Sequence, residues 1–371
     1  MSRASARLGK GLDRGMGLDI SQGLNRRQGL NRSKGSGEDA GQRLEQRWIK
    51  VLLLGIVLFV GLLASRVGLA CSVVTPTSTA SFGSLSSLIV GTTVQQTQPV
   101  PNAGLRCPGS VLTLLSGGYY INATLTSANN GRLRNSAGDT IGYQAYADNA
   151  GQVPLTLGTT FNYYNTGLLA LLNGSVEPPM SFRTQPGTAG NVSAGTYTDT
   201  LTVSWSWRIC PSIGALGLCI GVVQQGTGTS VITLSLTISP DCVINAPNLD
   251  FGSAPLVSGF NPVTQTLSVR CTKGQSYSVG IGSGMHATGT QRRLEAGGNY
   301  LAYEIYQGAA SSTRWGNQGS ARRQSSQADT RAGIYDGLNG QGFTYRAEIL
   351  PNQPTPPPAT YTDTLVVDVA F

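Results

Sequence analysis

Six cysteines are the residues of this chain whose type and number indicate chemistry: Cys71, Cys107, Cys210, Cys219, Cys242 and Cys271. They follow an apolar export-type segment, and an even number of cysteines in an exported chain indicates disulfides, although six allow fifteen pairings. No Cys-x-x-Cys occurs, so a redox function is not indicated. Metal binding by Cys210 and Cys219 would lack other ligands nearby in the sequence.

The remaining residue types argue against catalysis. His286 is the only histidine, and charged residues make up 12% of the chain, about half of the roughly 25% typical of a globular protein. There is no Gly-x-Ser-x-Gly nucleophile motif and no pair of acids in a context that would shift their pKa values. We therefore expect no enzyme, no cofactor and no metal site.

The chain also repeats one pattern of motifs. In order, each copy has a cysteine, Phe-Gly-Ser, a second cysteine, Tyr-x-x-Tyr, an aromatic–Arg pair and Tyr-Thr-Asp-Thr-Leu. The last motif follows the second cysteine by 90 residues in both copies (107 to 197 and 271 to 361). The repeat predicts a first copy at 71–238 and a second at 239–371. It pairs Cys71 with Cys107 and Cys242 with Cys271, which leaves Cys210 with Cys219.

The elements expected to carry these residues are strands. Short alternating runs separated by Gly, Pro and Asn fill both copies, and Thr364–Phe371 alternates like a strand with one buried face. We expect two tandem immunoglobulin-like antiparallel β-sandwiches. The first has an additional amphipathic strand, with one apolar face made of Ile232, Leu234, Leu236 and Ile238. The second has no equivalent, so it either leaves an open apolar edge or accepts a strand from another chain.

Residues 1–70 are expected to be an N-terminal extension and signal peptide. The apolar run 51–64 follows Arg47 and Lys50 and is shorter than the roughly 20 residues of a membrane span. We place cleavage after Ala70, with a type II membrane anchor as the alternative. No free segment then precedes Cys71, so the mature chain would receive a strand without donating one.

Positive charge is concentrated in this leader. Residues 71–371 have fourteen basic and thirteen acidic side chains, so a nucleic-acid partner is not expected. The pairs Arg292-Arg293 and Arg322-Arg323 fall in polar stretches, and we expect them to be solvated loop residues.

The Cys…Phe-Gly start, Arg314-Trp315-Gly316 and the terminal Tyr361-Thr-Asp-Thr-Leu-Val-Val-Asp-Val-Ala-Phe371 resemble the spore coat protein U domain family. This domain forms the pilins of archaic, Csu-type chaperone–usher pili. The resemblance is strong across 242–371 and weaker across 71–238. It implies a periplasmic chaperone, an outer-membrane usher and an adjacent pilin subunit that donates a strand to 239–371. Two domains without a donor segment are typical of the tip adhesin of such pili, which is exported through the periplasm to the cell surface.

Apolar loops of the first copy are the candidate binding sites for an abiotic or host surface. The loop 208–230 would hold Ile213, Leu216 and Leu218 on a hairpin closed by Cys210 and Cys219, unless it folds back onto the core. A second candidate contains Leu168, Leu169, Leu171 and Leu172, which could instead be buried. We expect Trp205 and Trp207 to pack in the sandwich rather than stack on a sugar. The expected function is surface attachment and biofilm formation; the alternative is a secreted coat protein or minor pilin without adhesive activity.

Overall fold

The computed structural model describes residues 71–108, 118–166, 175–210, 214–215, 218–219 and 222–371. They belong to one compact unit, Gly68–Phe371. The described residues form β-strands and short 3-10 turns, which confirms the all-β prediction. The expectations for 1–70 lie outside the described residues. Within the described ranges, no helix is long and apolar enough to cross a membrane.

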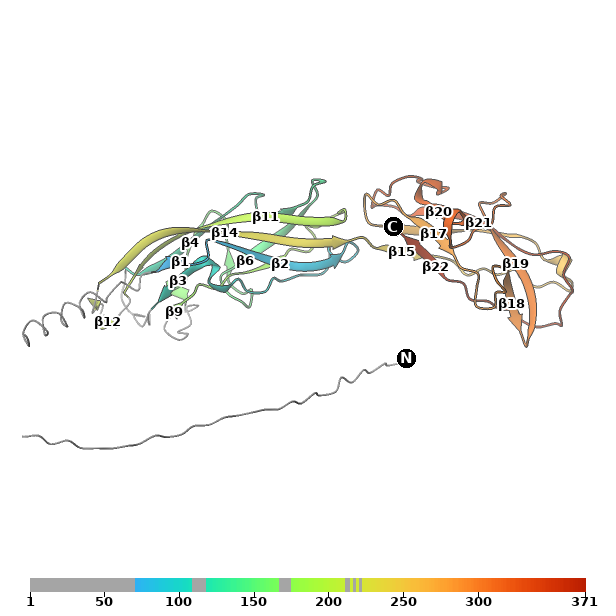
Figure 1. Ribbon diagram of the computed structural model, residues 1–371, viewed down its shortest axis with the longest axis horizontal. Helices are drawn as coiled ribbons and strands as arrows, with labels where there is room; N and C mark the ends of the chain where they lie inside the picture. The colour runs from blue at the N-terminus through green and yellow to red at the C-terminus, as the bar shows by residue number, and fades with distance from the viewer. Residues whose placement is uncertain (1–70, 109–117, 167–174, 211–213, 216–217, 220–221) are drawn as a thin grey trace, which may run out of the picture. The chain divides into compact units, whose positions relative to one another are not determined.

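The first copy is built around two long antiparallel strands, β11 (Gly195–Ile209) and β14 (Gln224–Ser239). β14 also pairs in parallel with β2 (Thr77–Ser86), so it lies between β11 and β2 (Figure 1). The other strands of this copy are β1 (Ser72–Val73), β3 (Leu105–Pro108), β4 (Tyr120–Ser127), β5 (Arg132–Arg134), β6 (Thr140–Tyr146), β7 (Pro154–Leu155), β8 (Thr160–Asn162), β9 (Ser175–Val176), β10 (Ser181–Thr184), β12 (Gly214–Ala215) and β13 (Leu218–Cys219). Its 3-10 turns are η1 (Pro101–Gly104) and η2 (Tyr163–Thr166).

The second copy has two sheets. One contains five strands in the order β15-β16-β21-β19-β18, and the other contains three in the order β20-β17-β22. The strands are β15 (Cys242–Asn245), β16 (Val263–Cys271), β17 (Ser278–Ile281), β18 (Arg292–Ala296), β19 (Asn299–Gln307), β20 (Arg323–Gln324), β21 (Gln341–Ile349) and β22 (Val367–Ala370). Its 3-10 turns are η3 (Val257–Gly259), η4 (Gly319–Ala321) and η5 (Ser325–Gln327).

Each copy has its own hydrophobic core. In β11 the buried side chains of Tyr197, Leu201 and Val203 alternate with outward-facing Thr and Ser residues, as expected for a strand with one face on the core. Residues of the second copy, such as Trp315 and Phe343, form a separate cluster. Burial of β-branched and aromatic residues on one face of each strand is therefore what assembles each sandwich.

Two structural features recur in both copies. The disulfides Cys71–Cys107 and Cys242–Cys271 are the pairs that the repeat predicts. Cys210 is also disulfide-bonded, whereas the side chain of Cys219 lies outside the described part. The second feature is a tyrosine corner. The hydroxyl of Tyr197 donates to the carbonyl of Ser193 at 2.6 Å, and that of Tyr361 donates to Pro357 at 2.8 Å, four residues upstream in each case. The last motif of the repeat is therefore structural.

Candidate functional site

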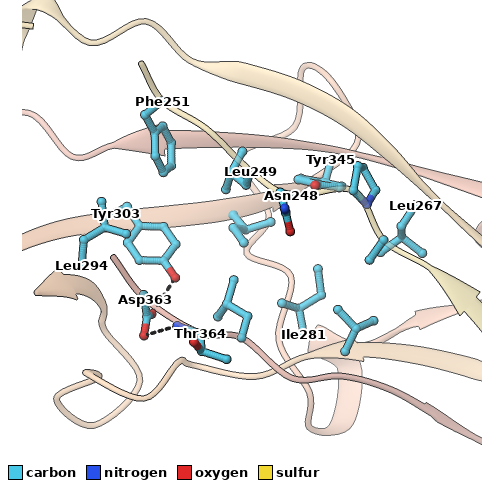
Figure 2. A pocket seen from close by; sticks show the side chains of 15 residues that line it. Asn248, Leu249, Phe251, Leu267, Ile281, Leu294, Tyr303, Tyr345, Asp363 and Thr364 are labelled. Atoms are coloured by element: carbon cyan, nitrogen blue, oxygen red, sulfur yellow. Dashed lines mark hydrogen bonds between the residues drawn. The ribbon is translucent and has the colours of Figure 1, made fainter. Parts of the chain in front are cut away.

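A groove of about 410 Å³ runs along the second copy beside β22. Its walls are the segments 246–251 and 363–367 (Figure 2). Side chains from the strands of both sheets form the floor, namely Leu267, Ile281, Leu294, Tyr303, Ile305 and Tyr345. The groove is thus bordered by two chain segments and has an apolar and aromatic base.

The corresponding space in the first copy is filled by β14. Through the Phe-Gly-Ser motif, the wall 246–251 corresponds to 77–82. Through the Tyr-Thr-Asp-Thr-Leu motif, the wall 363–367 corresponds to 199–203. In the first copy these segments belong to β2 and β11, and β14 pairs with both of them. The groove therefore occupies the position of one strand.

The side chains of β14 indicate what such a groove holds. Leu234 stands opposite Asp199 on β11 and Ala80 on β2. Their counterparts in the second copy, Asp363 and Leu249, both line the groove. The structure places all four apolar residues of the strand in the first core, each at most 1% exposed: Ile232, Leu234, Leu236 and Ile238.

The strand beside the groove is shorter and less buried than the sequence predicts. The sequence predicts a strand over Thr364–Phe371 with one buried face, but β22 covers only Val367–Ala370. Leu365 and Val367 are half-buried and Phe371 is exposed. On one side the segment bonds to β17 and the residues after it, for example through the amide of Gly282 and the carbonyl of Val366 at 2.8 Å. Its other side faces the groove, so the strand loses the neighbour that would extend and bury it.

The carboxylate in the groove wall is already saturated with hydrogen bonds. Asp363 Oδ2 accepts from the hydroxyl of Tyr303 at 2.7 Å, and Oδ1 accepts from the amides of Met285 and Thr364 at 2.9 Å. Burial and the neighbouring Asp363 raise the pKa of Tyr303, so its hydroxyl stays protonated and donates. Tyr143 makes the same bond to Asp199 in the first copy, which identifies the pair as a structural part of the repeat.

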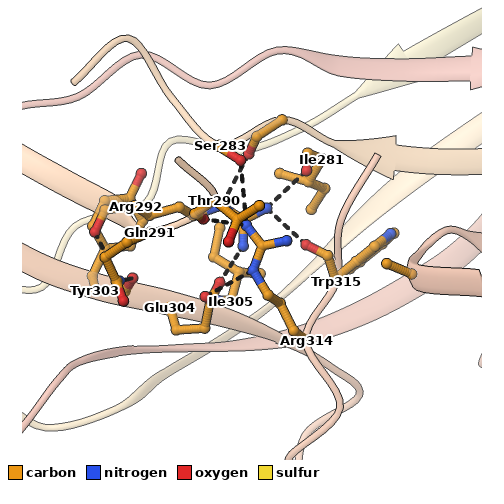
Figure 3. Close-up of polar contacts among 12 residues, drawn as sticks. Ile281, Ser283, Thr290, Gln291, Arg292, Tyr303, Glu304, Ile305, Arg314 and Trp315 are labelled. Atoms are coloured by element: carbon orange, nitrogen blue, oxygen red, sulfur yellow. Dashed lines mark hydrogen bonds and ion pairs between the residues drawn. The ribbon is translucent and has the colours of Figure 1, made fainter. Parts of the chain in front are cut away.

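A buried ionic cluster joins the two sheets of the second copy (Figure 3). Arg292 is fully buried and contacts Glu304, which also accepts from Arg314 Nε at 2.9 Å. The Arg292 guanidinium donates to the carbonyls of Ile281 and Trp315, both at 2.7 Å. This fixes the floor strands β17, β18 and β19 relative to each other, because a buried guanidinium requires its partners.

The expectation that both arginine pairs are solvated loop residues is therefore wrong. Arg292 and Arg293 lie in β18, Arg323 lies in β20, and the Arg322 side chain is only 12% exposed and pairs with Asp368. Arg292 is fully buried, and Arg323 is only 5% exposed and lies over the ring of Trp315, 5.1 Å from its centroid. Main-chain carbonyls and a carboxylate replace the water that these guanidinium groups would otherwise bind.

The residues predicted to contact a surface belong to two loops of the first copy. Ile213 and Leu216 lie outside the described residues, as do Leu168, Leu169, Leu171 and Leu172, and the side chain of Leu218 in β13 is likewise not described. Trp205 and Trp207 are buried in the first core, and Trp205 Nε1 donates to Ser230 Oγ at 2.9 Å. Packing, rather than sugar stacking, is confirmed for both.

Sequence reasoning missed the residues that form the groove. From the sequence, Leu249, Phe251, Leu267 and Ile281 are not assigned to a groove, although Phe251 belongs to a motif of the repeat. The repeat is the signal that could have found them. A residue next to β14 in the first copy has a counterpart in the second copy that faces the groove.

A search of curated proteins gives no match for this chain. In the part of the chain that is described, no group of three or more His, Cys, Asp or Glu residues could hold a metal ion.

One solved structure is similar over most of the chain: the CsuC-CsuE chaperone–tip adhesion subunit pre-assembly complex from the archaic chaperone-usher Csu pili of Acinetobacter baumannii. The identity is 24% and the TM-score is 0.55, over 81% of this chain and 100% of that chain. This similarity shows that the two chains share a fold. The CooA pilin subunit from enterotoxigenic Escherichia coli is matched at 11% identity and a TM-score of 0.27, over 44% of this chain and 91% of that chain.

The family model of the Spore Coat Protein U domain matches twice, at residues 61–204 and 228–368. The two matches cover most of the chain and include the walls and floor of the groove. The chain therefore belongs to the Spore Coat Protein U domain family.

Proposed function

We propose that the chain is the tip adhesin of an archaic chaperone–usher pilus. The observation that carries the proposal is the groove in the second copy, a channel one strand wide between two chain segments with an apolar and aromatic floor. A site of this kind suits an extended strand from another chain, held by main-chain hydrogen bonds and by alternate side chains. The family and the similarity to CsuE, a tip adhesion subunit, support this function.

The first copy predicts how the strand docks. β14 runs antiparallel to β11 and parallel to β2. An incoming strand of the same polarity would run antiparallel to 361–370 and parallel to 246–253. One of its apolar side chains would fall between Asp363 and Leu249, and the next between Leu365 and Pro247. A donor sequence should therefore have large apolar residues at alternate positions there.

The order of partners follows from this groove. A periplasmic chaperone would cover it first, because an exposed apolar channel beside an unpaired strand invites aggregation. The next pilin subunit would replace the chaperone at the outer-membrane usher, which would bring the chain to the cell surface. In this proposal β14 completes the first domain, 71–238, and the second domain, 239–371, joins the chain to the pilus.

Surface attachment and biofilm formation are assigned to the first domain. The proposed contacts are the apolar residues of the loops around Leu168–Leu172 and Ile213–Leu218, which normally mark interaction sites when exposed. The second candidate function is a coat protein or minor pilin that assembles through the same groove without adhesion.

Strand binding can be tested with the chain's own sequence. A synthetic peptide of residues 227–239 carries the side chains that fill the first sandwich, so it should bind the second groove of the oxidised full-length protein. We expect the thermal unfolding transition of the second domain to rise by several degrees. A peptide with Asp at the positions of Leu234 and Leu236 is the control.

Two neighbouring residues of the groove wall provide matched variants. Leu365→Asp places a charge in the groove and should abolish the peptide effect, whereas Val366→Asp changes a side chain that is 67% exposed and should preserve it. A transition that ignores the peptide, or equal effects of the two variants, would contradict a strand-accepting groove.

Adhesion requires a separate measurement. Bacteria whose pili carry the triple variant Ile213→Asp, Leu216→Asp and Leu218→Asp should form pili of normal number and attach less to plastic. The control is Leu256→Asp at an exposed residue of the second copy. Unchanged attachment of piliated cells would favour the non-adhesive alternative while leaving the groove intact.

A further inference from the structure

The two copies differ in the carboxylates that lie near their arginines. In the second copy Glu304 stands directly opposite Glu348, on β19 and β21. Arg292 and Arg314 contact Glu304, and Arg346 contacts Glu348. Each of these three guanidinium groups therefore has a carboxylate partner within the same copy, whereas Arg293, opposite Ala302, donates to the carbonyl of His286.

At the matching place in the first copy there is no carboxylate. Gln144 follows Tyr143 as Glu304 follows Tyr303, and the residue directly opposite Gln144 on β10 is Arg183. Two residues earlier on β6, Gly142 stands opposite Arg132 of β5. Because opposite and alternate residues share a face, both arginines belong to the outward face of β5, β6 and β10.

The contacts of these two arginines leave their charge uncompensated. Arg132 donates to Thr140 Oγ1 at 2.8 Å and to the carbonyl of Thr188 at 3.3 Å. Arg183 donates to Gln96 Oε1 at 2.9 Å and to the carbonyl of Ala150 at 2.6 Å. Within the described residues neither forms an ion pair. Neutral acceptors fix both guanidinium groups without cancelling their charge.

The surroundings hold Arg183 in a defined position. Gly151 has φ +64°, and a Cβ there would lie 2.4 Å from the guanidinium, so this turn has room for Arg183 only with glycine. The guanidinium carbon lies 5.5 Å from the centre of the half-buried ring of Tyr146. The charge is therefore presented by a rigid group beside an aromatic ring.

Two adjoining depressions hollow this face. The first, of about 320 Å³, is lined by Arg132, Gln144 and Gln185, and the second, of about 530 Å³, by Tyr146, Arg183 and Gln185. Gln185, which is exposed, is shared by both. They form a shallow surface with two cations, two side-chain amides and an aromatic ring.

We propose that this face, the outward side of β5, β6 and β10, binds an acidic polysaccharide. Two fixed guanidinium groups suit the carboxylates of a uronic acid polymer, which they can bind through charge-assisted hydrogen bonds. The exposed amide of Gln185 supplies a donor and an acceptor for sugar hydroxyls. The NH2 group of Gln144 donates to the carbonyls of Ala145 and Leu155, so Gln144 offers its Oε1 as an acceptor, and Tyr146 provides apolar contact. The site shares no residue with the strand-accepting groove.

The test uses the oxidised full-length protein and alginate, a polymer of uronic acids, with neutral dextran as the reference. We expect alginate to bind, dextran not to bind, and binding to weaken as salt rises. Arg132→Gln and Arg183→Gln should each weaken it about tenfold, the loss typical of one charge-assisted hydrogen bond. Arg208→Gln, which removes the same charge from an exposed position on β11, should leave binding unchanged.

One variant separates charge from folding. Gln185→Glu keeps the size of an exposed side chain and places a carboxylate between the two arginines, as the second copy does with its own glutamates. It should weaken alginate binding about tenfold without moving the thermal transition. Equal binding to dextran, or wild-type binding by Gln185→Glu, would overturn the proposal. So would the same charge-variant dependence for duplex DNA or for phosphatidylglycerol vesicles.

Discussion

The two copies differ in what fills the space between their two corresponding wall segments. In the first, the space between β2 and β11 contains β14, and Leu201 on β11 is fully buried. In the second, the same space is a groove and the counterpart of Leu201, Leu365, is only half-buried. The repeat therefore specifies the walls and floor of a sandwich, whereas the strand that closes it is a separable part.

The comparison predicts unequal costs for the same truncation. Leu201→Ala should lower the free energy of unfolding by about 2–5 kcal/mol, because it leaves a cavity in a closed core. Leu365→Ala should cost only about 1 kcal/mol, because that side chain faces an open groove. Denaturant unfolding measures both. Equal losses would mean that the second sandwich is as tightly closed as the first.

A second pair of variants should behave alike. Tyr143→Phe and Tyr303→Phe each leave a carboxylate, Asp199 or Asp363, without one of its hydrogen bonds. Each should lower the free energy of unfolding by about 1–3 kcal/mol. Because burial raises the pKa of both tyrosines, their ionisation in a spectrophotometric titration should begin well above pH 10. A clear loss in only one copy would show that the repeated bond does not have a repeated role.

The smallest expected effect is a change in the free energy of unfolding at acidic pH. Burial would raise the pKa of Asp329, but hydrogen bonds from Arg323 and from the amide of Thr344 outweigh it and hold the pKa of this carboxyl below its usual value. The carboxylate therefore stabilises the folded second copy at pH values above about 4. That contribution is lost as pH falls through the lowered pKa.

Unfolding at a series of pH values between 2 and 5 measures this effect. Asp329→Asn should flatten the acid limb of the second transition, and Asp336→Asn, at an exposed loop, should not. Parallel curves for wild type and Asp329→Asn would exclude a role for this pair.

Much of the architecture could be predicted because it follows directly from the order and spacing of the sequence motifs. The repeat predicts the pairs Cys71–Cys107 and Cys242–Cys271, and the alternation in Val231–Ile238 predicts which side chains of β14 face the core. Both follow from local order along the chain.

What could not be predicted depends on neighbours distant in sequence. Arg292 is buried because carbonyls of Ile281 and Trp315 happen to converge on it, and no spacing reveals that convergence. The shortened β22 has the same origin, since a strand's length is set by its partners as well as by its own residues. The residues of the groove floor could not be predicted for the same reason, although a comparison of the two copies of the repeat would have identified them.

The connection between the copies has a mechanical consequence. Only Pro240 and Asp241 separate the end of β14 from β15, which begins at the Cys242–Cys271 disulfide. A pull on the second copy therefore reaches the first along the axis of β14. The bonds of β14 to β11 and β2 lie across that axis and are loaded in shear, so they must give way nearly together rather than one after another. The strand that completes the first core is thus also placed to withstand tension.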